Sequence, residues 1–325
     1  MENDIQKQLG KYYTISNPFD LCVFRNWFNS IPDVFNLTII EPFAGSNNIV
    51  KLMNVGNDWE CYDILPSTNL VPKFKIIQRD TITNFPKGPQ IAITNPPYLA
   101  KNSATRNKLE YVGDPYDDLY KKCLEVLLSN VDYVAAIIPE SFITSGLFQD
   151  RLSIFISLTC KMFNDTDCPV CLALFSKDPT PDFLVYRMDD FLGSYNKELI
   201  WYKPVNMKLY DWTFNDPKGE IGIVCIDSTQ GNTIRFVEGD NISPEKIKVS
   251  SRSLTRVHGP RIKNISLFLE KCTDYLEWFR GNTFDVFLTT FKGLRVDGLY
   301  RRRLDFDTAK AIMESVLVHF KEDLL

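Results

Sequence analysis

The chain has 325 residues, of which 44% are hydrophobic and 24% are charged, and its formal net charge is −4. This composition is that of an ordinary globular protein; no apolar run approaches the roughly 20 residues that a membrane-spanning helix requires, and the polar N-terminus lacks the apolar core of a signal peptide. Because one hydrophobic core rarely extends beyond about 250–300 residues, the length favours two domains.

In the first half of the chain, helical and strand patterns alternate. Ser16-Asn17-Pro18 predicts the cap and first turn of an amphipathic helix that continues through Phe28. Strands are predicted over residues 37–40, 59–62, 76–78, 90–94 and 131–138, and helices over 48–54 and 117–129. This alternation predicts the α/β class, with a Rossmann-like parallel sheet covered on both faces. Ligands of such sheets bind outside the carboxyl ends of the strands.

The pattern changes after the apolar segment 154–160. Residues 168–175 and 183–187 predict a β-hairpin around Pro179 and Pro181. From about residue 196 onward, short strands such as 222–226 and 233–237 are mixed with turns and two late helices. We therefore expect a larger domain over residues 1–195, with an antiparallel hairpin at one edge of its sheet, and a smaller mixed α+β domain over residues 196–325.

Charge is distributed unevenly along the chain. Residues 241–325 carry a net charge of +4, whereas the first 240 residues carry −8. An acidic N-terminal part and a basic C-terminal part are the charge distribution expected if a polyanion binds the C-terminal part. Chance asymmetry is the alternative.

The sequence Asn95-Pro96-Pro97-Tyr98 follows the predicted strand 90–94. Two consecutive prolines remove two backbone donors and fix two φ angles, so the strand ends there in a rigid corner. An exocyclic amine on an aromatic ring is a poor nucleophile, because its lone pair is delocalised into the ring. Carbonyl oxygens of Asn95 and Pro96 can accept both amine hydrogens and draw the nitrogen toward tetrahedral geometry, while Tyr98 stacks on the ring. The corner predicts a clamp for a planar amine, with a purely structural turn as the alternative.

A second loop, Glu41-Pro-Phe-Ala-Gly45, follows the predicted strand 37–40. In a doubly wound sheet the two loops are neighbours at one edge. Gly45 permits a ligand to approach the backbone closely, and Asp63, at the next strand tip, has the position of the acidic residue that binds the ribose of nucleoside cofactors. Asp63, like Asp80 after the strand 76–78, also fits a turn cap.

Taken in chain order, these sequences resemble the S-adenosylmethionine-dependent adenine-N6 DNA methyltransferases. The resemblance rests on Lys11-Tyr-Tyr-Thr14, Glu41-Pro-Phe-Ala-Gly45, Asp63, Asp80 and Asn95-Pro-Pro-Tyr98. With the Tyr-Thr motif first and the presumed recognition region last, the order is similar to the γ arrangement of restriction–modification enzymes. Residues 134–142 (VAAIIPESF) also resemble the stretch beyond the family's catalytic motif, and the resemblance covers roughly residues 10–190.

The resemblance implies a role for each of these residues. Thr14 and the loop around Phe43 contact the methionine part of the cofactor, Asp63 the ribose and Asp80 the adenine amine. Phe163 stacks on the far face of the flipped base, with core packing as the alternative. The implied cofactor-binding set is Thr14, Glu41, Pro42, Phe43, Ala44, Gly45, Asp63, Asp80 and Asn95, and the catalytic set is Asn95, Pro96, Pro97, Tyr98 and Phe163.

Two positions depart from the family's pattern. Asn47 stands where many relatives have a second glycine, and because asparagine tolerates left-handed backbone angles the loop can survive. Ile15 stands where a proline often follows the threonine, which leaves the contact of Thr14 open.

Basic residues dominate parts of the second domain. Three adjacent arginines, 301–303, cannot all lie on a buried face, and His258 lies in a basic segment where contact with DNA competes with simple solvation. The residues that we predict to contact DNA are Arg252, Arg256, His258, Lys292, Arg295, Arg301, Arg302 and Arg303.

The cysteines indicate neither a disulfide framework nor a metal site. Eight of them are scattered along the chain, which suits a reducing cytosol. Cys168 and Cys171 have the spacing of a redox or zinc motif, but the chain has no second such pair and only two histidines. We predict no metal.

The sequence thus predicts a site-specific DNA methyltransferase that moves a methyl group from S-adenosylmethionine to the N6 amine of a flipped adenine in duplex DNA. Residues 1–195 form its catalytic domain and residues 196–325 its target-recognition domain. We expect a monomeric, cytoplasmic, prokaryotic or phage-encoded modification enzyme of a type II restriction–modification system, whose restriction endonuclease acts separately. The alternatives are a methyltransferase of an RNA base or a protein glutamine amide, and a catalytically inactive DNA-binding specificity module.

Overall fold

The computed structural model describes residues 12–164, 166–291 and 299–325. The chain separates into two compact units, Met1–Tyr195 and Asn196–Leu325. Lys11, Lys292 and Arg295 lie outside the described residues, so the predictions for them stay predictions. Among the described residues, no helix is long and apolar enough to cross a membrane.

The first unit is built on one sheet. Its described strands are ordered β3-β2-β1-β4-β5-β7-β6-β8-β9. Their bounds are β1 Ile39–Glu41, β2 Trp59–Asp63, β3 Ile76–Gln78, β4 Ile91–Thr94, β5 Tyr133–Pro139, β6 Leu152–Leu158, β7 Val170–Phe175, β8 Leu184–Arg187 and β9 Asp190–Ser194. The first five strands of this order, from β3 through β2, β1 and β4 to β5, pair in parallel. This parallel pairing confirms the predicted α/β sheet. The strand order reverses between β1 and β4, and the carboxyl ends of strands at such a point form the ligand-binding crevice.

The antiparallel part of the sheet differs from the predicted pairing. β7 lies between β5 and β6 and is antiparallel to both, whereas β8 is parallel to β6 and pairs with β9. The predicted hairpin between residues 168–175 and 183–187 is therefore wrong. Every residue of β7 is buried, and such an apolar strand is more stable in the sheet interior than at an edge.

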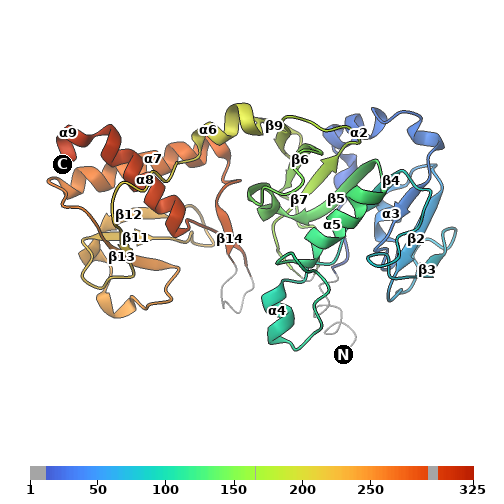
Figure 1. The fold of residues 1–325 in the computed structure, drawn as a ribbon, viewed down its shortest axis with the longest axis horizontal. Helices are drawn as coiled ribbons and strands as arrows, with labels where there is room; N and C mark the ends of the chain where they lie inside the picture. The colour runs from blue at the N-terminus through green and yellow to red at the C-terminus, as the bar shows by residue number, and fades with distance from the viewer. Residues whose placement is uncertain (1–11, 165, 292–298) are drawn as a thin grey trace. The chain divides into compact units, whose positions relative to one another are not determined.

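Helices cover both faces of this sheet. They are α2 Cys22–Asn29, α3 Asn48–Met53, α4 Lys101–Arg106 and α5 Leu119–Asn130, with the short 3₁₀ turns η1 Pro18–Asp20, η2 Val34–Asn36 and η3 Glu140–Thr144. Figure 1 shows α5 lying across the front of β4 and β5. On the opposite face, Phe24, Trp27 and Phe28 of α2 share one hydrophobic cluster with side chains from β1, β4, β5 and β7.

The first helix is interrupted where one continuous helix was predicted. Asn17, not Ser16, caps the turn η1 by accepting a hydrogen bond from the Phe19 amide. Leu21 then adopts extended backbone angles (φ −60°, ψ 135°), and α2 begins only at Cys22. The apolar face predicted through Leu21, Phe24 and Phe28 is nevertheless buried.

The second unit contains a sheet with described strands in the order β10-β13-β11-β12 and a separate hairpin, β14-β15. The bounds are β10 Thr213–Phe214, β11 Ile221–Val224, β12 Arg235–Glu238, β13 Leu254–His258, β14 Thr289–Phe291 and β15 Arg301–Arg303, with helices α6 Ile200–Tyr202, α7 Ile265–Thr283, α8 Phe306–His319 and α9 Lys321–Leu324. The turns are η4 Tyr195–Leu199, which crosses the boundary between the units, η5 Gly239–Asn241 and η6 Pro244–Lys246. Phe268, Cys272, Leu276 and Phe279 recur along α7 at helical spacing and are all buried.

A buried ion-pair network joins α7 to the hairpin. The Arg280 guanidinium binds both carboxylate oxygens of Asp227, at 3.1 and 2.7 Å, and also pairs with Asp285. Asp227 in turn donates its backbone N–H to the Arg302 carbonyl of β15 at 3.0 Å. Burial alone would lower the pKa of Arg280, but its hydrogen bonds with Asp285 and Asp227 raise the pKa instead. The network therefore holds the arginine-rich strand against the end of β11.

We predict that Arg280→Met lowers the free energy of unfolding of the second unit by about 3–5 kcal/mol, because it leaves the buried Asp227 carboxylate and the half-buried Asp285 carboxylate without their cation. Urea denaturation followed by circular dichroism measures this loss. The matched control is Arg25→Met, which breaks an ion pair whose side chains are 61% and 63% exposed and should cost about 1 kcal/mol or less. Equal losses in the two variants would show that the Arg280 network contributes little.

Candidate functional site

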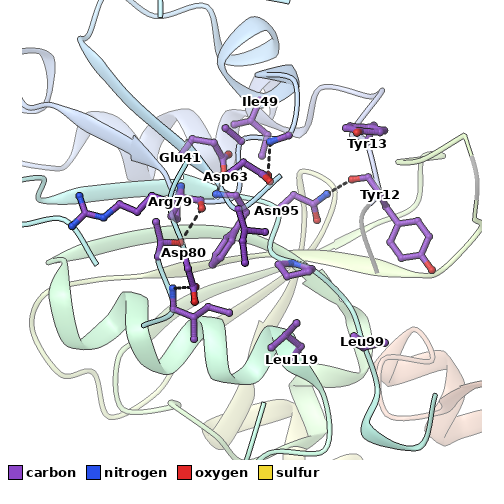
Figure 2. Close-up of a pocket in the computed structure, with 18 of the residues that line it drawn as sticks. Tyr12, Tyr13, Glu41, Ile49, Asp63, Arg79, Asp80, Asn95, Leu99 and Leu119 are labelled. Atoms are coloured by element: carbon purple, nitrogen blue, oxygen red, sulfur yellow. Dashed lines mark hydrogen bonds between the residues drawn. The ribbon is translucent and has the colours of Figure 1, made fainter. Parts of the chain in front are cut away.

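A cavity of about 240 Å³ opens at the carboxyl ends of β1 to β4, and Figure 2 shows the residues around it. The predicted site residues that line it are Thr14, Glu41, Pro42, Phe43, Ala44, Gly45, Asp63, Asp80, Asn95 and Pro97. The structure thus brings together residues from four strand ends and from the N-terminal segment. Tyr12, Tyr13, Arg79, Leu99 and Leu119 also line the cavity; nothing in the sequence alone assigned them to it, although Tyr12 and Tyr13 stand beside Thr14.

Glu41 ends β1 and is 1% exposed. Its Oε1 atom accepts hydrogen bonds from the Phe43 amide (3.1 Å) and the Thr94 hydroxyl (2.6 Å), while Oε2 is buried without a hydrogen-bond partner. Burial raises the pKa of Glu41 to about 8, and the nearby Asp63 carboxylate adds to this increase. A cationic group in the cavity would satisfy Oε2 and stabilise the ionised form.

Asp63, at the end of β2, is 3% exposed and organises the loop after β1. One carboxylate oxygen accepts a hydrogen bond from the Gly45 amide at 2.9 Å, and the other accepts from the Leu65 amide at 2.7 Å. The predicted alternative of a turn cap is thus realised in the structure. Because each carboxylate oxygen has a second lone pair, these bonds do not exclude a ribose hydroxyl.

The loop after β1 approaches the N-terminal segment closely. Gly45 has φ +53°, and a Cβ atom there would lie 3.0 Å from the ring of Tyr13. Asn47 adopts left-handed angles (φ 65°) before α3, as expected from its residue type. Its Nδ2 atom donates to Asn69 Oδ1 (2.9 Å) and to the Phe74 carbonyl (3.0 Å), so it also ties the segment 69–74 to the loop. Asparagine therefore supplies contacts that a second glycine lacks.

Asp80 follows β3 and is half-buried. It accepts hydrogen bonds from the Ile82 amide (3.0 Å) and the Thr83 hydroxyl (2.8 Å), which are the contacts of a turn cap. Its neighbour Arg79 donates to Asn84 and lies over the Tyr62 ring, 5.5 Å from the centroid. Asp80 thus lies at the cavity wall, and its cofactor role stays a prediction.

The Asn95 amide is held from two sides. Its Nδ2 atom donates to the Tyr12 carbonyl at 2.7 Å and lies 3.4 Å from the Thr14 hydroxyl. Its Oδ1 atom lies 2.6 Å from the Tyr98 hydroxyl, which also lies 2.7 Å from the Ile137 carbonyl. Since Tyr98 has one hydroxyl hydrogen, these two oxygens compete for it. Burial raises the pKa of Tyr98 well above its usual value, so the hydroxyl remains a donor.

The N-terminal segment is anchored beside this amide. Thr14 forms a β-bridge with Phe163, the Ile15 amide donates to the Met162 carbonyl at 2.9 Å, and Tyr13 shares a 2.7 Å hydrogen bond with Ser67. Thr14 itself is buried. The segment therefore contacts both the corner Asn95–Tyr98 and the loop after β1.

The structure corrects the expected role of Phe163. Its ring is 1% exposed and belongs to the core. It meets Tyr98 at 6.0 Å with an interplanar angle of 75°, and an edge-on contact at this distance leaves no room for a base between the two rings. Phe163 packs as a core residue here, because the N-terminal segment covers it. Pro96 is likewise buried, whereas Pro97 is half-buried at the cavity.

The predicted DNA-contacting residues of the second unit fall into two groups. Arg252 and His258 are exposed, and Arg301, Arg302 and Arg303 are half-buried on β15. Arg256 contradicts its prediction: it is 8% exposed, its Nε atom donates to the Gly219 carbonyl, and its guanidinium pairs with Asp240 at 2.9 Å. Buried and paired, Arg256 directs its Nε and one guanidinium nitrogen to partners within the fold.

Alternation along β15 divides the three arginines. Arg301 and Arg303 lie on one face of the strand and Arg302 on the other. Arg303 donates to the Thr289 hydroxyl at 3.2 Å and lies over the Phe291 ring, and burial lowers its pKa. One DNA surface therefore meets at most two of them.

Cys168 and Cys171 form no metal site with their neighbours. Cys171 is buried in β7, and the described residues contain no group of three or more histidine, cysteine, aspartate or glutamate side chains placed to hold a metal ion. All eight cysteines are free thiols.

No protein-family model matches the chain, and no curated protein matches it. Solved structures resemble parts of it. One is a modification subunit of a putative type I restriction enzyme from Vibrio vulnificus (13% identity, TM-score 0.39, covering 57% of this chain and 49% of that one). Another is a putative class I S-adenosylmethionine-dependent methyltransferase from Listeria monocytogenes (14%, TM-score 0.38, covering 54% and 68%). A third is the M protein of the type I restriction enzyme EcoKI (13%, TM-score 0.34, covering 89% and 67%).

The aligned region spans about half the length of the Vibrio vulnificus subunit. Likenesses with TM-scores of this size carry no argument about what the chain does. We base the functional inference on the strand order and on the cavity at the strand ends.

We predict that Glu41 makes stability depend on pH. Because the pKa of Glu41 is about 8 in the folded chain and 4.5 for an unperturbed glutamate, folding takes up a proton between these values, and the free energy of unfolding falls as pH rises through this window. The isosteric variant Glu41→Gln should lack this decrease. The free energy of unfolding of the variant, relative to wild type, should therefore increase by up to about 1.4 kcal/mol for each pH unit.

Urea denaturation at several pH values between 4.5 and 8 measures the difference. In a companion variant, Thr94→Val, the carboxylate loses a hydrogen bond that lowers its pKa, so the upper end of the window should move to higher pH. Parallel curves for wild type and Glu41→Gln would show that Glu41 titrates normally.

Proposed function

We propose that the chain is a site-specific DNA methyltransferase that uses S-adenosylmethionine to methylate the N6 amine of a flipped adenine, as part of a restriction–modification system. One observation carries this proposal. The rigid corner Asn95–Tyr98 lies at the carboxyl end of β4, on the rim of a cavity whose other strand ends present Glu41, Asp63 and Asp80.

The cavity has features that fit S-adenosylmethionine. The unpartnered Glu41 Oε2 faces a cationic ligand favourably, and the Gly45 backbone leaves space that a Cβ would fill. Asp63 would accept hydrogen bonds from the ribose hydroxyls and Asp80 from the adenine amine of the cofactor, and the loop Phe43–Gly45 would contact its methionine part. When bound, the cofactor supplies an electrophilic methyl group on a sulfonium, and transfer of this group leaves a neutral thioether.

Asn95 orients the attacking amine. Its Nδ2 is committed to the Tyr12 carbonyl, so Oδ1 is the acceptor available to the amine. The Tyr98 hydroxyl can donate to the Ile137 carbonyl, 2.7 Å away, and this frees Oδ1 to accept an amine hydrogen. With the Pro96 carbonyl accepting the second hydrogen, the nitrogen lone pair is localised and directed at the methyl group, and the nitrogen then loses one proton to water.

The second unit supports duplex DNA as the substrate. It holds the exposed Arg252 and His258 and the arginine-rich strand β15, and basic side chains of this kind bind phosphates. The N6 amine is out of reach inside a stacked duplex, so the adenine must be extruded before methylation. A separate unit of this size also favours DNA over a glutamine amide or a single RNA base.

We predict that Asn95→Ala lowers turnover on the order of 10²–10³-fold, the usual loss for one polar contact to the reacting group. Transfer of labelled methyl from S-adenosylmethionine to genomic DNA that lacks adenine methylation measures turnover, and chromatography of the hydrolysed DNA identifies N6-methyladenine. Binding of S-adenosylhomocysteine, measured by calorimetry, should change far less.

The control for this variant is Asn130→Ala, which alters an exposed asparagine at the end of α5 and should keep wild-type turnover. Near wild-type turnover in Asn95→Ala would show that Asn95 does not hold the reacting amine. Absence of methylated adenine with wild-type protein would overturn the proposed function itself.

We also predict that simultaneous Arg301→Ala, Arg302→Ala and Arg303→Ala substitutions flatten the salt dependence of DNA binding. Each lost phosphate contact reduces the slope of log affinity against log salt by about 0.9. Since one face of β15 holds two arginines at most, the decrease should not exceed about 1.8, equally for cognate and unrelated DNA.

Comparing Arg301→Ala/Arg303→Ala with Arg302→Ala identifies the face that meets DNA. Lys51→Ala, at an exposed lysine of the first unit, serves as the control. A wild-type slope in the triple variant would show that DNA binds elsewhere.

A further inference from the structure

Three aromatic rings meet beside the catalytic corner. The centroid of the Tyr12 ring lies 5.8 Å from Tyr98 and 5.8 Å from Phe163, and Tyr98 and Phe163 lie 6.0 Å apart. Tyr12 and Tyr98 are half-buried, whereas Phe163 is buried. Of these three residues, Tyr12 is the one that also lines the cavity.

Tyr12 packs against Tyr98 in a tilted arrangement. Phe163 and Tyr120 meet Tyr98 edge-on, at interplanar angles of 75° and 81°. Tyr12 is inclined by only 37°, which is the arrangement nearest to stacking among the three neighbours. A base that stacks on this side of Tyr98 would compete with the Tyr12 ring for the same space.

A polar group also lies at the place where the amine of a target base would bind. A planar amine bound there would donate a hydrogen to Asn95 Oδ1, and the Tyr98 hydroxyl, 2.6 Å from that atom, fills this place. The hydroxyl has a second acceptor ready in the Ile137 carbonyl. The Tyr98 hydroxyl thus occupies the acceptor that an amine would use, and the Tyr12 ring lies beside it.

The Tyr12 ring lies on the side of the site where the target base is expected to bind. In the view of Figure 2, it lies on the side of Asn95 away from Glu41, Asp63 and Asp80, which surround the expected cofactor position. Its neighbour Tyr13 points the other way, toward Gly45 and Ser67. The two consecutive tyrosines therefore contact different parts of the site.

We propose that Tyr12 is a placeholder for the target base: its ring fills the slot against Tyr98 until an extruded purine displaces it. The inference rests on the proposed function, since it takes the ligand of this slot to be the target adenine. The Tyr12 backbone stays in place, because its carbonyl continues to accept the Asn95 hydrogen bond while the ring rotates away.

The experiment titrates 2-aminopurine deoxyriboside, a fluorescent purine nucleoside whose emission is quenched by stacking. Saturating S-adenosylhomocysteine fills the cofactor cavity, so that the nucleoside reports on the target slot alone. In Tyr12→Ala the slot is open, and the dissociation constant of the nucleoside should fall roughly 2- to 10-fold, which corresponds to the loss of one competing aromatic contact. The KM for unmethylated genomic DNA should fall in the same variant.

Tyr12→Phe keeps the ring and should retain the wild-type affinity. Phe35→Ala is the matched control, because Phe35 is 66% exposed and also contacts one aromatic neighbour, Phe28. If thermal denaturation shows that Tyr12→Ala is unfolded, Tyr12→Leu provides the same test, since leucine keeps apolar bulk but removes the ring.

Tighter nucleoside binding in the ring-less variant supports the placeholder. Unchanged or weaker binding overturns it and makes Tyr12 a platform that the base needs, or a structural residue. The two proposals fail separately: if wild-type protein methylates DNA but Tyr12→Ala binds the nucleoside less tightly, only the placeholder fails. If Tyr12→Ala binds it more tightly but wild-type protein methylates no DNA, only the proposed function fails.

Discussion

The hydrogen bond from the Asn95 amide to the Tyr12 carbonyl joins two segments that are 83 residues apart. A backbone carbonyl can only accept, so the amide must turn its NH₂ group toward Tyr12 and its oxygen the other way. That orientation decides whether Asn95 offers an acceptor or a donor to a ligand. The N-terminal segment is in turn held by the bridge between Thr14 and Phe163. The chemistry of the corner therefore depends on a contact that the corner itself does not contain.

Much of the first unit follows from local sequence signals. Apolar runs that end on a polar residue or on proline predicted the parallel strands, and the topology of parallel sheets then required Glu41, Asp63, Asp80 and Asn95 to meet at one edge. The left-handed backbone of Asn47 was likewise predictable, because few residue types tolerate it. These features depend on short stretches of chain and on a general rule of topology.

The features that sequence patterns missed depend on distant partners. The place of β7 between β5 and β6 is decided by which strands bury it, and proximity along the chain suggested β8 instead. Arg256 is predicted to contact DNA because it lies in the polar, basic segment around His258, yet in the fold its side chain binds the Gly219 carbonyl and Asp240. Phe163 is covered by a segment nearly 150 residues earlier in the chain, through the β-bridge between Phe163 and Thr14. No local sequence pattern predicts this contact.

The two tyrosines of the N-terminal segment explain how one short stretch can serve two ligands. In an extended chain consecutive side chains point to opposite sides, and here Tyr13 contacts the loop at Gly45 while Tyr12 contacts Tyr98. Anchors at Tyr13 and Ile15 fix the backbone on either side of Thr14. In the proposed displacement, the Tyr12 side chain rotates and loses its contacts with Tyr98 and Phe163, which are worth about 0.5–1.5 kcal/mol each. A purine that stacks on Tyr98 would regain one contact of the same kind. Hydrogen bonds from the base to Asn95 and Pro96 would offset the remaining cost, and they would favour a ligand that carries an amine over one that only stacks.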